Sequence, residues 1–374
     1  MTILIAPNAF KDSLDAMAAA HCIAKGLERA LPEARLIIHP VADGGDNTLD
    51  TLGNSSSARF ITIESRDPLN RKLKARYAIM KDGNALIEMA ATSGVHLLAS
   101  YERKAGVTSS FGTGMLIADA IKKGSHKIFL GVGGTATVDA GTGILRALGF
   151  RFLDKFGKNV EEGGLNLAMV ETIVPPPSVE EIKKTKIIIL SDVTNPLLGR
   201  EGAAHVFAPQ KGASPEEVET LEKSMQHFCR IVEKMTGNDI SSMPYGGAAG
   251  GVPAGLSAFL NVTCRNGAET ILDLTHFDHE LEKADLVITG EGKLDSQTGG
   301  GKAPMAVATR ARAAGKQVLF IGGQVPAAPN DPASGHFDAV FSISPGVTDL
   351  DRALANAGEW LERTAYNIGK VLFR

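Results

Sequence analysis

The 374-residue sequence has few cysteines, no excess of charge of either sign, and no long apolar run. Its three cysteines, Cys22, Cys229 and Cys264, lie far apart without a C-x-x-C pair, which argues against a disulfide framework or a zinc site and favours a reducing cytoplasm. The formal net charge is −3, so the sequence shows no electrostatic footprint for nucleic acid or an anionic membrane. We therefore expect small-molecule partners, no nucleic acid and no membrane.

The apolar segments are short throughout the chain. None approaches the roughly 18 residues of a membrane-spanning helix, and the start, MTILIA, lacks the basic region and the length of a signal peptide. It predicts a first β-strand instead. At about 100–200 residues per domain, the length predicts about two domains.

Short apolar runs alternate with helical patterns, which is typical of a parallel α/β sheet. Between residues 59 and 89, three strand-like runs separated by turn signals predict antiparallel strands of a second domain. The parallel runs occupy residues 3–6, 36–41, 127–132, 186–191, 284–289, 317–321 and 339–343.

Capping signals locate two helices. Ser178 with Glu181, and Ser214 followed by Pro215, predict helix starts with a capping box, and Gly237 ends the second helix. The glycine-rich residues 246–251 have no periodicity and predict a loop.

Four polar clusters directly follow predicted strands. Ligands bind beyond the carboxyl ends of strands in open α/β sheets, so this coincidence predicts a site. The clusters are residues 7–13 (PNAFKDS), 42–48 (ADGGDNT), 191–196 (SDVTNP) and 290–302 (GEGKLDSQTGGGK).

A fifth segment, residues 131–143, is rich in glycine and lies between an apolar run and a helix-compatible stretch. Glycine lets the backbone approach a ligand closely, and the amides and the positive end of the next helix favour an anion. We therefore predict phosphate binding at Gly131, Gly133 and Gly134. A plain turn between strand and helix is the alternative.

These segments contain every part that a nucleotide kinase needs, namely a phosphate cradle, carboxylates for Mg²⁺ and cations for the transferred phosphoryl group. As the alternative to binding Mg²⁺, the aspartates would cap helices or form Asx turns. The candidate cations are Lys11, Lys293 and Lys302, and the candidate carboxylates are Asp43, Asp192, Glu291 and Asp295.

Two other nucleotide-binding motifs fit less well. There is no Walker A motif, because no Gly-Lys pair is followed by Ser or Thr. Residues 131–136 match G-x-G-x-x-A, and Asp154 stands 18 residues further on, near the place of a ribose-binding acid. That dinucleotide hypothesis leaves Glu291, Lys293 and Asp295 without a role.

Taken in order along the chain, the motifs resemble those of the type I glycerate kinases, ATP-dependent kinases of a small hydroxy acid. The resemblance covers nearly the whole sequence and is far more specific than any one motif. It rests mainly on FK at 10–11, VADGG at 41–45, IEMA at 87–90, GTG at 112–114, GVGG at 131–134 with Thr137 and Asp139, DVTNPL at 192–197, PQKG at 209–212, GAAGG at 247–251, VITGEG at 287–292, DSQ at 295–297 and GK at 301–302.

The resemblance implies two α/β domains. One would be Rossmann-like, with a parallel sheet built from both chain ends (residues 1–60 and 282–374), and the other an inserted domain with a mixed sheet (residues 61–281). It also implies phosphorylation of D-glycerate by ATP and Mg²⁺, most often to 2-phosphoglycerate.

The implied site residues fall into three groups. Nucleotide binding is assigned to Gly131, Gly133, Gly134, Thr135, Glu291, Gly301 and Lys302. Substrate binding is assigned to Lys11, Ser13, Asp43 and Asn195. Catalysis is assigned to Asp43, Asp192, Lys293 and Asp295, of which Asp192 and Asp295 are also the metal candidates.

Several positions depart from the family pattern. Asn8-Ala9 stand where Asp-Ser is usual, Asp46-Asn47 where Glu-Gly is usual, Val138 and Ala140 replace Asn and Gly, and Lys293 replaces Arg. Asn8 removes a carboxylate, Val138 cannot hydrogen-bond through its side chain, and Lys293 lacks the bidentate fork of Arg. We expect these changes to affect substrate preference or rate.

Alternatives to the 2-kinase hypothesis are phosphorylation at C3, action on a related hydroxy acid, and a catalytically silent sensor of glycerate or nucleotide. A homo-oligomer is compatible with the sequence, which does not set the number of subunits.

Overall fold

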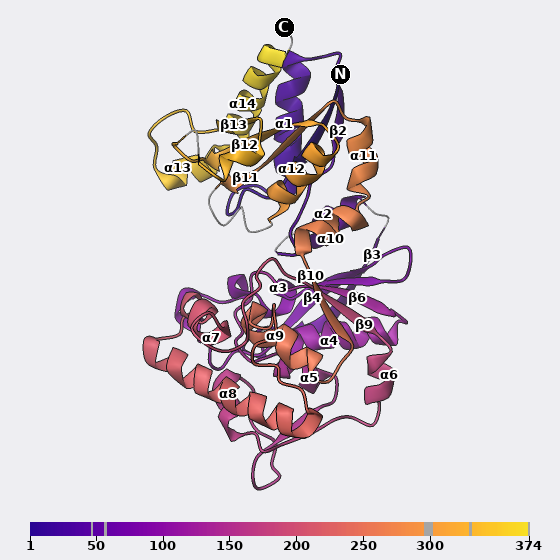
Figure 1. Ribbon diagram of the computed structural model, residues 1–374, viewed down its shortest axis with the longest axis vertical. Helices are drawn as coiled ribbons and strands as arrows, with labels where there is room; N and C mark the ends of the chain where they lie inside the picture. Colours follow the sequence, from indigo (N-terminus) through magenta and orange to yellow (C-terminus); the bar gives the residue numbers. More distant parts are fainter. Residues whose placement is uncertain (46–47, 56–57, 295–301, 329–330, 373–374) are drawn as a thin grey trace. The chain divides into compact units, whose positions relative to one another are not determined.

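The computed structural model describes residues 1–45, 48–55, 58–294, 302–328 and 331–372. The chain forms two compact units (Figure 1). Unit 1 comprises Met1–Asp43, Asp50–Ser55 and Asn266–Arg374, and unit 2 comprises Gly44–Leu49 and Ser56–Arg265. Both contain a β-sheet with helices, so the predicted α/β class is confirmed.

Unit 1 contains a five-stranded sheet in the order β13-β12-β11-β1-β2, with every neighbouring pair parallel. Strand β1 lies at an interior position and pairs with β11 in the register Ile3↔Leu286, so both chain ends build this sheet, as predicted. The strands are β1 (Thr2–Pro7), β2 (Arg35–Ile38), β11 (Leu286–Lys293), β12 (Gln317–Gln324) and β13 (Ala339–Ser342).

The apolar residues of β1 explain its interior position, because they are buried on both faces of the sheet, as expected for a parallel strand between helices. Ile3 and Ile5 pack into the core formed with α1 and α14, whereas Leu4 and Ala6 pack into the core formed with α10, α11 and α12. The helices of unit 1 are α1 (Ala16–Ala30), α10 (Gly267–Leu274), α11 (Phe277–Lys283), α12 (Ala303–Ala313), α13 (Leu350–Ala355) and α14 (Ala357–Leu372), and α2 (Thr48–Ser55) begins in unit 2 and ends in unit 1.

Helices α1 and α14 lie side by side (Figure 1), and small residues bring their backbones together. A Cβ atom on Gly26 of α1 would lie 2.2 Å from the carbonyl oxygen of Glu362 in α14. Glu362 also forms ion pairs with Lys25 and Arg29 of α1. The contact therefore combines close backbone packing with charge pairing at its surface.

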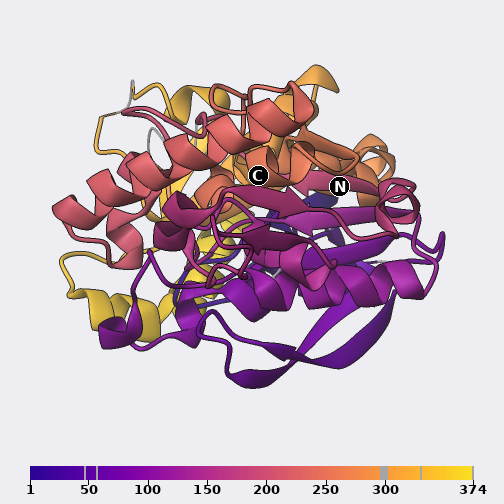
Figure 2. The ribbon, with the colours of Figure 1, turned by 90° about the horizontal axis from the view of Figure 1, so that it is seen from below.

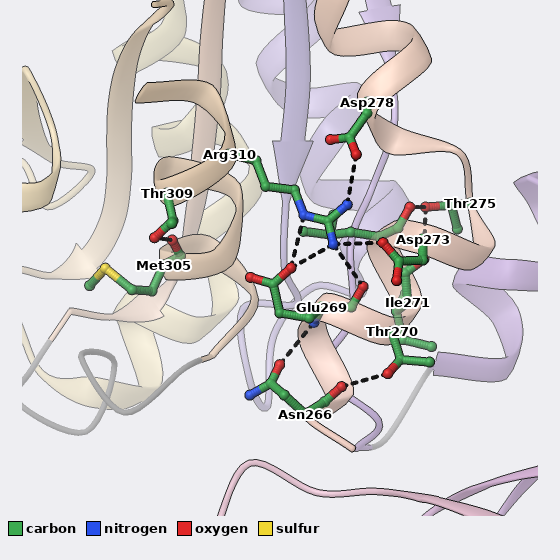
Figure 3. A network of polar contacts seen from close by, with 11 residues as sticks. Asn266, Glu269, Thr270, Ile271, Asp273, Thr275, Asp278, Met305, Thr309 and Arg310 are labelled. Carbon is green, nitrogen blue, oxygen red and sulfur yellow. Dashed lines mark hydrogen bonds and ion pairs between the residues drawn. The ribbon is translucent and has the colours of Figure 1, made fainter. Parts of the chain in front are cut away.

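The guanidinium of Arg310 joins the three helices on the other face of the sheet (Figure 3). From α12 it contacts Glu269 and Asp273 of α10, at 2.5 and 2.7 Å, and Asp278 of α11, at 3.0 Å. Burial lowers the pKa of Arg310, but the hydrogen-bonded carboxylates together outweigh it and hold this pKa above its usual value. One cation thus fixes the mutual position of α10, α11 and α12.

Unit 2 contains a six-stranded mixed sheet in the order β10-β9-β6-β5-β4-β3. The strands from β10 to β5 are parallel, and β4 and β3 are antiparallel additions. The strands are β3 (Arg59–Arg66), β4 (Lys72–Ile79), β5 (Ala85–Glu88), β6 (Lys127–Gly131), β9 (Lys186–Leu190) and β10 (Val262–Arg265), and a separate pair contains β7 (Arg151–Leu153) and β8 (Thr172–Val174).

The helices of unit 2 include the long α8, which lies on the opposite side of the unit from the β3–β4 hairpin (Figure 2). The predicted antiparallel pairing at 59–89 is confirmed, because β4 pairs antiparallel with both β3 and β5, although β5 also pairs in parallel with β6. The helices are α3 (Ala90–Ser93), α4 (Phe111–Lys122), α5 (Thr142–Ala147), α6 (Val179–Lys183), α7 (Ala203–Phe207), α8 (Pro215–Thr236) and α9 (Ala248–Ser257).

Some of the predicted helix boundaries are confirmed and others are not. The Ser214 side chain accepts a hydrogen bond from the Glu217 amide, and Gly237 ends α8 in a left-handed conformation, as predicted, but the Glu217 side chain accepts from the Gly106 amide and no capping box forms. The side chain of Ser178 forms no such cap on α6, so that capping box is wrong. The predicted loop at 246–251 continues into α9 through residues with positive φ.

The predicted boundaries at 60 and 282 differ from the limits of the compact units. Helix α10 and most of α11 precede residue 282, yet Leu272 and Phe277 pack in the same core as β1 and β11. The second segment of unit 1 accordingly begins at Asn266. The division into domains at 60 and 282 stays a prediction.

The close approach of α1 and α14 leads to a test of stability. Gly26→Ala is expected to lower the free energy of unfolding by about 1–3 kcal/mol, because the new methyl group would clash with a backbone atom of α14. Gly358→Ala in α14 is the matched control, since its Cβ would lie 3.4 Å from the Cys22 sulfur, an ordinary contact. Urea unfolding measures both; equal stability of the two variants would contradict the packing argument.

Candidate active site

In unit 1, the segments after β1 and β2 meet, as expected at the carboxyl edge of a parallel sheet. The Asn8 amide nitrogen donates to Asp43 Oδ2 over 3.4 Å, and its Oδ1 accepts from the Ala9 amide at 2.8 Å. An aspartate at position 8 would instead place two carboxylates together. The departure at Asn8 therefore replaces charge repulsion by a hydrogen bond and orients Asp43.

Lys11 and Ser13 lie on the same loop. The Lys11 side chain is exposed, and its backbone nitrogen lies near Gly292, where an added Cβ would approach to 3.4 Å. The Ser13 hydroxyl donates its proton in a hydrogen bond to the Leu354 carbonyl at 2.7 Å, and this proton does not serve a substrate. The predicted role of Ser13 in substrate binding would therefore use its oxygen as an acceptor.

Strand β11 extends further than predicted. Glu291 and Lys293 lie within the strand, in register with Gly322 and Gln324 of β12, and not in the loop that the sequence suggests. Glu291 is buried, whereas Lys293 is exposed. Lys302 is the N-cap residue of α12 and makes no side-chain cap. Asp295 and Gly301 lie outside the described residues.

In unit 2, the glycines after β6 allow close backbone contacts. A Cβ on Gly131 would lie 2.5 Å from the Gly44 carbonyl oxygen, and one on Gly133 would lie 2.5 Å from Gly45 Cα. The Gly133 amide also points to the Gly44 carbonyl, at 3.5 Å. Part of the glycine requirement therefore comes from packing within unit 2, whatever the turn binds.

Helix α5 begins only at Thr142, eleven residues after β6 ends at Gly131. The predicted helix after the glycine-rich segment is therefore present, but it does not open directly at Gly131–Gly134. The dinucleotide hypothesis loses its basis as well, because that fingerprint requires the helix to open within the glycine motif. Asp154 instead closes an exposed turn by accepting from the amides of Phe156 and Lys158.

A buried carboxylate organises the chain between β6 and α5. Asp139 is fully buried and accepts hydrogen bonds from the Ser110 amide and hydroxyl, at 2.9 and 2.8 Å, and from the amides of Gly141 and Gly143. Burial raises the pKa of Asp139, and these hydrogen bonds act in the opposite direction. The sequence gives Asp139 no signal beyond its place in the motif behind the family resemblance.

Lys211 is the second important residue that the site prediction missed. Its side chain is only 5% exposed, and its Nζ donates to Thr135 Oγ1 at 3.1 Å and to the Thr137 carbonyl at 2.8 Å. Burial lowers its pKa from 10.5 to about 7, against the opposing attraction of Asp139. Its one sequence signal is the PQKG motif, which looks like an ordinary exposed turn.

The third predicted cluster follows β9. Asp192 is partly buried and lies two residues after the end of this strand. The side-chain amide of Asn195 donates to the backbone carbonyl of Glu201 at 2.8 Å. The backbone carbonyl of Asn195 accepts a hydrogen bond from the Gly247 amide at 2.9 Å. Asn195 therefore holds the turn after β9 against the segment leading into α9, which adds a structural role to its predicted substrate contact.

The departures at 138 and 140 lie in the core. Val138 and Ala140 are fully buried and belong to the hydrophobic core of unit 2. A Cβ on Gly255 of α9 would lie 1.7 Å from the Ala140 carbonyl oxygen, so α9 packs directly on this backbone. Their side chains therefore serve packing, and Asn47 lies outside the described residues.

Two further findings apply to the described part of the chain. It contains no group of three or more His, Cys, Asp or Glu side chains placed to hold a metal ion. None of its helices has both the length and the apolar character needed to cross a membrane.

Comparisons with known proteins agree with this set of motifs. Residues 3–373 match the model of the glycerate kinase family, to which the chain therefore belongs. It is 40% identical over 374 residues to a glycerate kinase of Bacillus cereus (strain ATCC 10987 / NRS 248), covering 99% of this chain and 98% of the relative. It is 36% identical over 376 residues to the glycerate 2-kinase of Escherichia coli (strain K12), covering 100% and 98%.

A solved structure from Salmonella typhimurium LT2, described as a candidate glycerate kinase 2, has a TM-score of 0.87 to this chain at 38% identity. It covers 100% of this chain and 98% of its own. The resemblance drawn from the sequence is thereby confirmed, and the fold is that of a kinase family. The roles of individual residues stay predictions.

The lowered pKa of Lys211 predicts a pH dependence of stability. Between pH 7 and 10.5 the unfolded chain keeps a proton on this lysine that the folded chain has lost, so the wild type should gain stability relative to Lys211→Met as pH rises. The difference should change by at most about 1.4 kcal/mol per pH unit. Urea unfolding at pH 6.5 to 9.5 measures it.

Lys104→Met, at an exposed position of the same unit, is the control and should leave the pH dependence of stability as in the wild type. A difference between wild type and Lys211→Met that stays constant with pH would show that Lys211 remains charged in the folded protein.

Proposed function

We propose that the protein phosphorylates D-glycerate with ATP, giving 2-phosphoglycerate. The observation that carries this proposal is the match to the glycerate kinase family over residues 3–373, together with relatives named glycerate kinase or glycerate 2-kinase over nearly their whole length. The position of the polar clusters at the carboxyl ends of β1 and β9 supports it.

Unit 1 would bind and orient the hydroxy acid. Lys11 and Lys293 are exposed cations on adjacent segments, and such charges suit a substrate carboxylate and a phosphoryl group. Asp43, oriented by Asn8, would accept a hydrogen bond from a substrate hydroxyl and draw its proton as the bond to phosphorus forms. Phosphoryl transfer depends mainly on such positioning and on charge stabilisation.

The residues proposed to bind nucleotide are considered in each unit separately. In unit 2 they are Gly131, Gly133, Gly134 and Thr135, and in unit 1 they are Glu291, Gly301 and Lys302. Lys302 precedes the first turn of α12, an 11-residue helix whose unpaired amides suit a phosphate. ATP would supply the transferred phosphoryl group.

The described residues fit Mg²⁺, which needs few protein ligands, better than a metal ion whose ligands all come from protein side chains. Mg²⁺ in kinases usually binds one or two carboxylates and otherwise phosphates and water, so the lack of a three-ligand group among the described residues does not conflict with it. Asp192, partly exposed after β9, is the described candidate, and Asp295 is the second. When bound, Mg²⁺ would neutralise phosphate charge.

A cytoplasmic location and a homo-oligomeric state stay predictions.

The activity is tested by ADP release with ATP, Mg²⁺ and D-glycerate, followed by ³¹P NMR of the product. We expect turnover and a phosphorus coupling pattern for attachment at C2. L-glycerate and other short hydroxy acids are the matched substrates. Turnover only of another acid would correct the substrate, whereas ATP binding without turnover of any acid would favour the sensor hypothesis.

The carboxylate assignment predicts that Asp192→Asn lowers kcat by at least about 10²-fold, because a metal ligand or base is lost. Asp295→Asn should have a similar effect. Asp154→Asn is the control, since Asp154 lies in an exposed turn of unit 2 and should keep wild-type kcat. Near-normal kcat in both Asp192→Asn and Asp295→Asn would show that other groups hold the metal.

A further inference from the structure

The Lys211 amine lies beneath the glycine-rich turn that follows β6. It reaches the turn from a short 3₁₀ helix, Pro209–Lys211, and its two hydrogen bonds join Thr135 and Thr137. Gly212 follows in a left-handed conformation (φ 93°), and a Cβ there would lie 2.2 Å from the Arg103 carbonyl oxygen. The backbone therefore fixes where the lysine side chain enters.

The hydrogen bonds match a neutral amine as well as a charged one. A neutral amine has two N–H donors, and two acceptors are present, whereas an ammonium group has three donors. The Thr137 hydroxyl oxygen is buried and has no hydrogen-bond partner in the described part of the chain. The residue whose backbone carbonyl accepts from Lys211 therefore also carries a buried hydroxyl oxygen without a partner among the described residues.

Charged groups from the neighbouring elements act on Lys211 and its surroundings. The buried Asp139 carboxylate attracts a charged Lys211 and also Arg146 of α5, whose own charge is disfavoured by burial. Arg103 contributes its backbone carbonyl next to Gly212. Burial and Asp139 therefore oppose each other at Lys211, and the balance leaves its pKa at about 7.

We propose that Lys211 is a proton-linked positioning residue that takes up a proton when an anionic group, a phosphate or a carboxylate, binds the turn Gly131–Thr135. The proposal rests on the anion-binding role given to this turn in the proposed function. The proton comes from the buffer and binds to the amine nitrogen, so no other reactant is needed.

The physical basis is electrostatic linkage. A nearby anion favours the charged form of a lysine, so binding raises the lysine pKa, and protonation in turn strengthens binding. If the pKa of Lys211 rises from about 7 by about one unit, binding at pH 7.5 takes up about 0.5 proton. The Kd for the anion should then rise about sixfold between pH 6.5 and 8.5.

Isothermal titration calorimetry tests the proposal with the full-length protein. MgADP and D-glycerate are titrated separately at pH 7.5 in Tris, HEPES and PIPES, whose ionisation enthalpies differ, so that the observed heat gives the number of protons taken up. We expect about 0.5 proton for the ligand that occupies the turn and none for the other. The two arms thus distinguish a phosphate from a carboxylate.

Lys211→Met should abolish this uptake, whereas Lys104→Met, at an exposed position, should retain it. If Lys211→Met does not fold, the pH dependence of Kd in the wild type still decides, because a Kd constant from pH 6.5 to 8.5 overturns the proposal. Uptake that persists in a folded Lys211→Met protein also overturns it.

The experiment separates this proposal from the proposed function. Binding of both MgADP and D-glycerate, with no proton uptake for either, overturns only the role of Lys211. Failure of both ligands to bind overturns the proposed function and this inference with it.

Discussion

The buried carboxylate of Asp139 is the interaction on which the centre of unit 2 depends. Removing a carboxylate from water is costly, so its oxygens must be surrounded by donors, and Ser110, Gly141 and Gly143 supply them. These bonds fix the backbone between β6 and α5 and hold it to the start of α4. Glycine is needed at 143 because a Cβ would lie 2.5 Å from the Phe111 nitrogen. A single charge, once buried, thus dictates the local sequence.

The same carboxylate links structure to chemistry. It favours the charged form of Lys211, while burial favours the neutral form, and the amine itself ties down the turn at Thr135 and Thr137. Unit 1 has a different arrangement, in which Asn8 directs an amide at Asp43 and exposed lysines lie nearby. The carboxylate at the centre of unit 2 is buried and compensated, whereas Lys11 and Lys293 of unit 1 are exposed.

The sequence predicts those features that depend on local patterns. Continuous apolar runs identify β1, β6, β9 and β11 because parallel strands between helices are buried on both faces. The length of β11 depends instead on β12, which pairs with Glu291 and Lys293, and the parallel pairing of β5 depends on β6. Strand ends locate the polar clusters. No local pattern distinguishes the buried Lys211 from an exposed lysine, or glycines that bind a ligand from glycines that pack against Gly44 and Gly45.

Strand β1 pairs on one side with β2 and on the other with β11, in the register Ile3↔Leu286. During translation at roughly 5–20 residues per second, the first strand waits for this partner on the order of tens of seconds. Unit 2 is nearly continuous in sequence and emerges complete in that interval. Unit 2 can therefore fold while the chain is still being synthesised, and one edge of the apolar strand β1 stays unpaired until β11 emerges. Because it is apolar and has an unpaired edge, strand β1 is the segment that we expect a chaperone to bind during synthesis.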